Sequence, residues 1–157
     1  VGLLAARAAA GARWGIRSAG LAAPEATRLR VYASAETHTW IDKAADLFGL
    51  GTEAVRQVPV DSQLRVLPEA LRAAVREDRA AGLQPFLVVG NAGTTATGTV
   101  DPLPALAAVA REEGLWFHVD GAYGGFAARV PGAHHADDRA PSRIGQGRQR
   151  GDRAQGV

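Results

Sequence analysis

The feature that most constrains the fold of this chain is an uninterrupted apolar segment, Pro85-Phe86-Leu87-Val88-Val89-Gly90. A strand with one face in water alternates apolar and polar residues, because successive side chains point to opposite faces. This segment has no polar residue on either face, which is typical of a strand covered by helices on both sides of a parallel sheet. We therefore expect residues 85–90 to form a central strand of such a sheet.

Strand-like and helix-like patterns alternate along the rest of the chain. Further strands are predicted at residues 29–34, 54–60 and 115–120, and the last of these is also expected to be buried. Helices are predicted at residues 3–14, 37–50, 68–81 and 101–113. We expect Asp101 to cap the last helix, because an acid followed by proline is typical of a helix start. The alternation predicts an α/β fold with a mainly parallel sheet and flanking helices.

Composition limits the class of protein. With 157 residues, 46% of them hydrophobic, the chain is long enough for one domain with a single core. It has no cysteine, which excludes disulfides, iron–sulfur clusters, thiolate zinc sites and a cysteine nucleophile. No apolar run reaches the ~18–20 residues of a membrane-spanning helix. We therefore expect a cytoplasmic protein without a membrane partner.

The net charge of +2 is unevenly distributed along the chain. Residues 139–157 contain five arginines and one aspartate, so residues 1–138 carry a net charge of −2. This slightly acidic body has no basic face for a nucleic acid, and we expect no such partner. Residues 134–157 lack hydrophobic periodicity and are predicted to be a disordered, Arg/Gly-rich tail. A tail that binds RNA through its charge is the alternative interpretation.

Polar residues follow three of the predicted strands. They form the clusters Ser34–His38 and Asn91–Thr95 and the single residue Asp120. In an open parallel sheet, ligands bind outside the carboxyl ends of the strands. Alternation along the last strand places Trp116, His118 and Asp120 on one face. One pocket could therefore contain an imidazole, hydroxyl groups and a carboxylate.

Each of these residues also has an ordinary structural interpretation. A histidine after a strand commonly caps or packs, a Gly-Thr-Thr segment can be a turn, and an aspartate can cap the next segment. A metal-dependent hydrolase is a further alternative, since imidazole and carboxylate groups suit zinc. Its candidate ligands are His118, Asp120, His134, His135 and Asp137.

Two segments in combination resemble the group II pyridoxal-phosphate-dependent decarboxylases, which include the aromatic-L-amino-acid, histidine and glutamate decarboxylases. They are Asn91-Ala92-Gly93-Thr94-Thr95-Ala96-Thr97-Gly98-Thr99-Val100-Asp101-Pro102 and His118-Val119-Asp120-Gly121-Ala122-Tyr123-Gly124-Gly125. The segment Ser34–Trp40, with Lys43-Ala44, is similar to the part of that family that carries a ring-stacking histidine. The resemblance covers residues 1–133 and implies part of a fold type I large domain that binds pyridoxal 5'-phosphate.

The resemblance assigns roles to four residues. Asp120 would pair with the pyridine nitrogen of the cofactor and keep it protonated, and His38 would stack on the ring face. Thr95 would position the cofactor edge or hydrogen-bond Asp120, and Ala122 would pack beneath the ring. The implied activity is decarboxylation of an aromatic or related L-amino acid. A homodimer is the implied assembly, and no metal is implied.

Two elements of the family pattern have no counterpart in the sequence. The family's Schiff-base lysine lies a few tens of residues beyond the aspartate, whereas Lys43 is the only lysine of this chain. The family's Gly-rich phosphate loop would precede Leu3, where Leu3–Arg7 resembles the helix that follows that loop. We therefore expect a central fragment of the large domain, with no catalytic lysine of its own, that is inactive alone.

Overall fold

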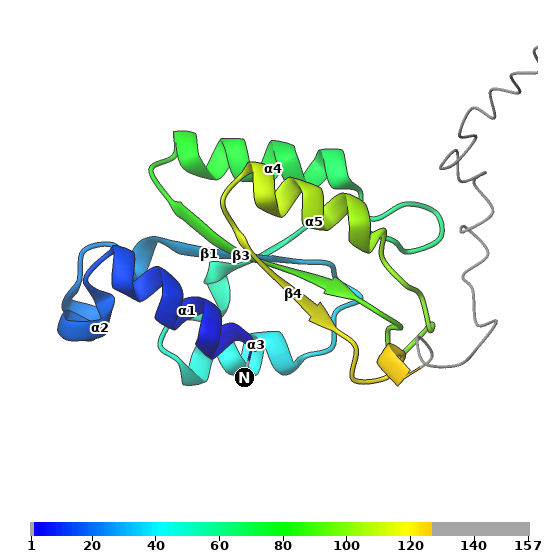
Figure 1. The fold of residues 1–157 in the computed structure, drawn as a ribbon, viewed down its shortest axis with the longest axis horizontal. Helices are drawn as coiled ribbons and strands as arrows, with labels where there is room; N and C mark the ends of the chain where they lie inside the picture. The colour runs from blue at the N-terminus through cyan, green and yellow to red at the C-terminus, as the bar shows by residue number, and fades with distance from the viewer. Residues whose placement is uncertain (1, 127–157) are drawn as a thin grey trace, which may run out of the picture.

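A computed structural model describes residues 2–126 of the chain. Its four strands form one sheet in the order β2-β1-β3-β4, and every pairing in it is parallel (Figure 1). The strands are β1 (Leu29–Ala33), β2 (Val55–Gln57), β3 (Gln84–Asn91) and β4 (Trp116–Asp120). This sheet confirms the predicted α/β fold. The residues predicted to form a disordered tail lie outside the described part of the chain.

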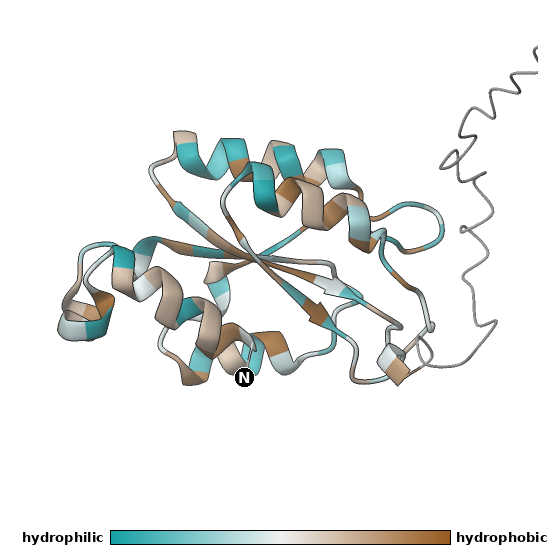
Figure 2. Ribbon diagram, in the orientation of Figure 1, coloured by the Kyte–Doolittle hydropathy of each residue, from teal (hydrophilic) through white to brown (hydrophobic). Residues whose placement is uncertain are grey.

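Helices cover both faces of the sheet (Figure 1). One face carries α1 (Gly2–Arg13), α2 (Ile16–Ala19) and α3 (Trp40–Leu47). The other carries α4 (Pro68–Ala80) and α5 (Leu103–Glu112). Short 3-10 helices also lie at Gly20–Ala22, Ala26–Arg28 and Thr52–Ala54. Figure 2 shows apolar residues along the central strands and polar residues on the outward surface of α4.

Strand β3 lies at the centre of the molecule, as its apolar sequence predicts. Leu87 and Val89 belong to the core shared with α1 to α3, whereas Val88 belongs to the core shared with α4 and α5. All three side chains are at most 1% exposed. Burying a Leu or Val side chain contributes roughly 1.5–3 kcal/mol, so this short segment stabilises both layers at once.

The connections between strands create a crevice at the carboxyl edge of the sheet. The chain passes from β1 through α3 to β2 on one face, and then returns through α4 to β3 on the other side of β1. The segments that follow β1 and β3 therefore diverge to opposite faces of the sheet. Such a reversal of strand order is where open α/β sheets bind ligands.

Two predicted elements are much shorter than expected. The helix predicted at residues 37–50 spans Trp40–Leu47, because Thr37 first forms a turn, in which its N–H donates to Ser34 O at 3.1 Å. The strand predicted at residues 54–60 spans only Val55–Gln57. Proline has no N–H for a sheet ladder, and after Pro59 the chain forms an isolated antiparallel bridge instead.

Two other expectations are wrong. Strand β4 is not fully buried: it is the last strand on its side of the described sheet, and Trp116 and Val119 are 42% and 40% exposed. Asp101 does not cap α5 with its side chain. The helix begins at Leu103, and the Asp101 carboxylate accepts hydrogen bonds from two other segments, described below. Helix α2 and the 3-10 helices were not predicted.

Candidate active site

The candidate site lies where the segments after β1, β3 and β4 meet. In the sheet register Asn91 stands beside Asp120, at the carboxyl ends of β3 and β4. The Ala92 N–H donates to Asp120 O at 2.8 Å, so the two strands stay paired to their last residue. The side chains of Trp116, His118 and Asp120 share the sheet face covered by α1 and α3, as alternation predicts.

Two donors hold the half-buried carboxylate of Asp120. The indole N–H of Trp40 donates to Oδ2 at 2.6 Å, and the backbone N–H of Ala122 donates to Oδ1 at 3.2 Å. A carboxylate offers about four acceptor positions. Each oxygen of Asp120 therefore retains one position for a further donor, including the protonated nitrogen of a bound ring.

His118 lies beside Asp120 on β4, under the first turn of α1. Its ring meets the Trp40 ring edge to face, with 5.6 Å between centroids and an interplanar angle of 87°. A Cβ on Gly2 would come within 2.4 Å of His118 Nδ1, so α1 approaches β4 this closely only with glycine there. Burial lowers the pKa of His118 below its usual 6.5, although the nearby Asp120 carboxylate opposes the shift. At neutral pH the uncharged form of the His118 ring is therefore favoured.

His38 and Thr95 are exposed at the same edge. The Nδ1 atom of His38 accepts a hydrogen bond from the backbone N–H of Trp40 at 3.2 Å. In a neutral ring the proton is then on Nε2. Thr95 is not one of the two donors to Asp120, and neither is His38. The structure thus joins Asp120 and Ala122 directly and connects His38 to them through Trp40.

A second carboxylate, that of Asp101, lies in a buried group of polar residues at the same edge of the sheet. We call this group, which consists of Ser34, Thr37, Asn91 and Asp101, the Asp101 cluster. Asp101 is 4% exposed. Its Oδ1 accepts from Val66 N at 2.8 Å, and its Oδ2 accepts from Asn91 N at 2.7 Å and from Asn91 Nδ2 at 2.9 Å. Asn91 Nδ2 also donates to Thr37 Oγ1 at 3.1 Å, and Thr37 Oγ1 lies 3.4 Å from Ser34 Oγ. These contacts join the segments that follow β1, β2 and β3.

Two glycines allow the segments after β3 and β4 to pack against each other. A Cβ on Gly124 would lie 2.2 Å from Ala92 O, and one on Gly93 would lie 3.0 Å from Gly124 Cα. Gly93 also has φ +91°, a conformation that side chains disfavour. Glycine is therefore needed in both motifs, because a side chain at either position would keep the segment after Asp120 from packing against the Thr94-Thr95 segment.

Sequence reasoning missed the contributions of Trp40 and Asp101. Trp40 fits the apolar pattern of a helix, and nothing local shows that its N–H reaches a residue 80 positions away. Asp101 precedes a proline, which favoured a capping role. A signal was available for Asp101, because a buried polar residue such as Asn91 at the end of an apolar strand needs a partner.

The alternative metal site receives no support from the described residues. Residues 2–126 contain no group of three or more His, Asp or Glu side chains placed to hold a metal ion. His134, His135 and Asp137 lie outside the described residues. Within the same part of the chain, no helix combines the length and apolarity needed to cross a membrane.

A cavity of about 280 Å³ lies at the other end of the strands. Ala6 and Arg13 of α1 and the following residue, Trp14, line one side of it, and Phe86 and Trp116 line the other. These are the amino-terminal ends of β3 and β4. Parallel sheets bind ligands at the opposite edge, so this cavity is separate from the Asp120 site.

The α/β fold places the accessible carboxylate of Asp120 at the carboxyl edge of the parallel sheet, where domains of this class bind their ligands. The conserved domain of the pyridoxal-dependent decarboxylases matches residues 1–142 of the chain. The chain therefore belongs to the pyridoxal-dependent decarboxylase family. The resemblance inferred from the motifs after β3 and β4 is confirmed.

Individual relatives span several named activities. The chain is 44% identical over 110 residues to 4-hydroxyphenylacetaldehyde synthase of Rhodiola rosea, covering 69% of this chain and 22% of the relative. It is 46% identical over 97 residues to cysteine sulfinic acid decarboxylase of Mus musculus, covering 62% and 20%. The aromatic-L-amino-acid decarboxylase of Bacillus atrophaeus is 39% identical over 114 residues, covering 68% and 24%. The chain thus spans under a quarter of the length of these curated relatives.

Solved structures show the same fold. The crystal structure of Oryza sativa TDC with pyridoxal phosphate and tryptamine has a TM-score of 0.73 and 40% identity, covering 82% of this chain and 27% of that one. The glutamate decarboxylase domain of a Vibrio parahaemolyticus enzyme has a TM-score of 0.75 and 34% identity, covering 84% and 30%. These similarities confirm the fold type I assignment.

Proposed function

We propose that this chain is the part of an amino-acid decarboxylase that binds the ring of pyridoxal 5'-phosphate. The observation that carries the proposal is the Asp120 carboxylate. It is half-buried at the carboxyl edge of the sheet, held by two donors, and able to accept more hydrogen bonds. Family membership supports the cofactor, and the solved relatives with bound pyridoxal phosphate support it further.

The residues around Asp120 fit a protonated pyridine ring. When bound, such a cofactor supplies an electron sink for the negative charge that develops as carbon dioxide leaves. Asp120 would hold the proton on the ring nitrogen, because a carboxylate stabilises an adjacent N–H cation most strongly where water is partly excluded. His38 would stack on the ring, Thr95 would lie at its edge, and Ala122 would pack beneath it. No residue of this chain is assigned the covalent role of the family's lysine.

The substrate proposed is an L-amino acid, aromatic or related. Relatives named for tryptophan and for aromatic amino acids support the aromatic class. Relatives named for cysteine sulfinic acid and acidic amino acids are equally similar, so the panel of test substrates must include both classes. A homodimer in the cytoplasm is the proposed setting. These proposals concern the whole protein rather than the 157 residues alone.

The test is a chimaera in which residues 2–126 replace the matching segment of Oryza sativa TDC. The host supplies the flanking segments, so activity depends on whether this chain provides a competent ring site. Release of carbon dioxide is measured with aromatic and acidic L-amino acids, and cofactor content is measured by absorbance. We expect the chimaera to retain bound cofactor and to release carbon dioxide.

Two controls make the chimaera informative. Unmodified Oryza sativa TDC gives the reference turnover, and circular dichroism identifies chimaeric protein that is folded. A folded chimaera that neither retains cofactor nor releases carbon dioxide would contradict the proposed function.

A further inference from the structure

Trp40 makes the contact that links the two halves of the candidate site. It is the first residue of α3, just after the segment that carries His38, yet its indole N–H reaches Asp120 at the end of β4. The distance to Oδ2 is 2.6 Å, and an ionised acceptor makes a hydrogen bond shorter and stronger than a neutral one does. The same ring packs against His118. One side chain therefore contacts both polar residues of β4 on this face.

The position of Trp40 is fixed from its own side as well. Its backbone N–H donates to His38 Nδ1, and the next residue, Ile41, is 3% exposed in the core beneath α3. One turn further along, Ala45 is fully buried. The indole is therefore held by the docking of the helix and does not depend on Asp120 alone for its orientation.

We propose that Trp40 is a positioning residue that sets the orientation of the Asp120 carboxylate for its ligand. The indole donor holds Oδ2 while the Ala122 N–H holds Oδ1, and two donors on different oxygens resist rotation of the carboxylate. Neither donor exhausts the acceptor capacity of its oxygen. Asp120 is therefore oriented before a cofactor arrives and is still able to bind one. The value of this orientation for catalysis rests on the proposed function, whereas the contact itself does not.

The first test uses the cofactor-free, 15N-labelled 157-residue chain. Its three tryptophans give three indole N–H signals in an NMR spectrum, and Trp40→Phe identifies the signal of Trp40. At a fixed neutral pH we expect this signal to shift in Asp120→Asn relative to the unmodified chain, because its acceptor loses its charge. The signals of Trp14 and Trp116 serve as internal references and should keep their positions.

A tryptophan that does not donate to Asp120 would not show this shift. A Trp40 signal at the same position in Asp120→Asn and in the unmodified chain would overturn the proposal. The same measurement is independent of pyridoxal phosphate. A shifted Trp40 signal in Asp120→Asn together with an inactive chimaera would therefore refute the proposed function and still support the Trp40 contact.

The second test asks whether the orientation affects cofactor binding in the chimaera. Trp40→Phe removes the N–H donor and keeps an aromatic ring against His118. We expect its affinity for pyridoxal phosphate to fall on the order of tenfold, the factor that corresponds to a free-energy change of 1.4 kcal/mol. Trp116→Phe is the matched control, because Trp116 lies on the same face of β4 and is exposed. Equal affinities in the two variants would overturn the positioning role.

Discussion

Asp101 and Asp120 both lie at the carboxyl edge of the sheet, yet the protein surrounds their carboxylates differently. Asp101 is 4% exposed, and three donors from Val66 and Asn91 surround it. Asp120 is half-buried, with two donors and free acceptor positions. The first carboxylate is enclosed by the protein, and the second is oriented but open. The comparison shows that the remaining access and acceptor capacity, rather than the residue type, distinguish the aspartate that we propose to bind the cofactor from the one that the protein encloses.

The two carboxylates also depend on each other through the chain. Asn91, which donates twice to Asp101, stands beside Asp120 in the sheet register. Its amide also reaches Thr37, one residue before His38. The enclosed cluster thus fixes the backbone from which the open site is built.

The largest effect is expected for Asp120→Ala in the chimaera. Turnover per folded molecule should fall at least about a thousandfold, which corresponds to about 4 kcal/mol of activation free energy. The reason is that the ring nitrogen would lose the group that keeps it protonated. Stability should change by only about 1 kcal/mol, because the residue is half-exposed and makes two hydrogen bonds.

Turnover assays and thermal unfolding of the same samples measure these two effects. Asp42→Ala, which alters an exposed acid on α3, is the control and should leave both quantities unchanged. A strong loss of stability with unchanged turnover per folded molecule would make Asp120 a structural residue like Asp101.

For Asp101→Ala we expect the larger effect on stability rather than on turnover. Three buried donors would lose their acceptor, and each unsatisfied buried group costs about 1–3 kcal/mol. We expect the free energy of unfolding of the 157-residue chain to fall by roughly 3 kcal/mol, measured by urea denaturation. Asp46→Ala, on the exposed face of α3, should cost less than about 0.5 kcal/mol. A loss as small as that of the control would show that the Asp101 cluster does not stabilise the fold.

Local sequence patterns predicted most of the fold because they record burial directly. The apolar run of β3 and the helical spacing of α4 each reflect which faces are covered, and both elements were found within one or two residues of their predicted ends. The exposed part of β4 was not predictable in the same way. The apolar sequence of β4 does not indicate whether another strand pairs with its outer edge.

The residues of the candidate site also differ in how far local sequence could predict them. Asp120 could be predicted because it ends a strand, and its role came from the family motif. The Trp40 donor could not, since its partner is distant in sequence and its neighbours fit a plain amphipathic helix. The true partners of Asp101 were also beyond the local pattern, because tertiary hydrogen bonds replaced the cap that the following proline suggested.

A smaller, pH-dependent effect is expected at His118, beside the open carboxylate. Burial lowers its pKa in the folded chain below the usual 6.5. The unfolded chain therefore binds more protons as the pH falls through this range, and stability is lost from about pH 6.5 downward through the folded pKa. Above that range the contribution is fully present. We expect His118→Gln to weaken this dependence.

Urea denaturation at pH 7.5 and at pH 5.5 measures the dependence. His38→Gln is the control, because His38 is exposed, and this variant should keep the full loss of stability at the lower pH. An equal pH dependence in His118→Gln and the unmodified chain would mean that the ring of His118 is accessible to water in both states.

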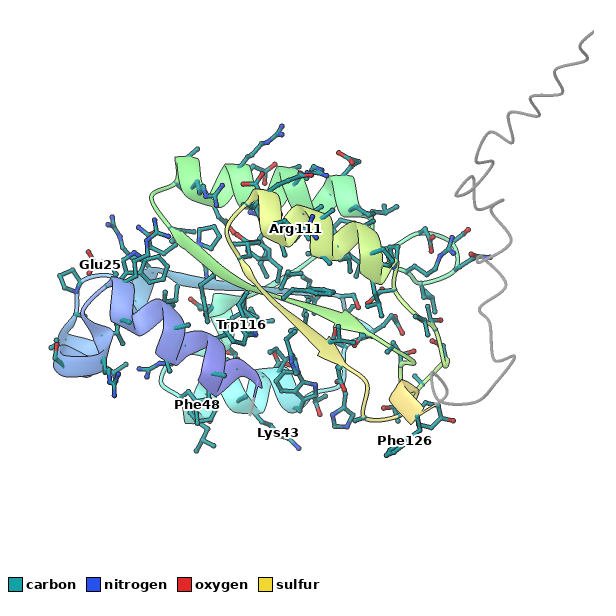
Figure 3. The ribbon with its side chains drawn as sticks, in the orientation of Figure 1. Glu25, Lys43, Phe48, Arg111, Trp116 and Phe126 are labelled. Atoms are coloured by element: carbon teal, nitrogen blue, oxygen red, sulfur yellow. The ribbon has the colours of Figure 1, made fainter. Side chains whose placement is uncertain are left out.

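The smallest effect is expected at Lys43, the only lysine of the chain. It lies on α3 close in sequence to Trp40, but Ile41 and Ala45 face the core whereas Lys43 is exposed, and Figure 3 shows it at the outer side of the helix. Its amine therefore lies on the solvent side of α3. After incubation of the 157-residue chain with pyridoxal phosphate and reduction with borohydride, peptide mapping should find labelling of Lys43 far below one per chain. Lys43→Arg gives the background. A stoichiometric adduct on Lys43 would show that α3 can turn this amine toward the open carboxylate, and the fixed position that we assign to Trp40 would then be wrong.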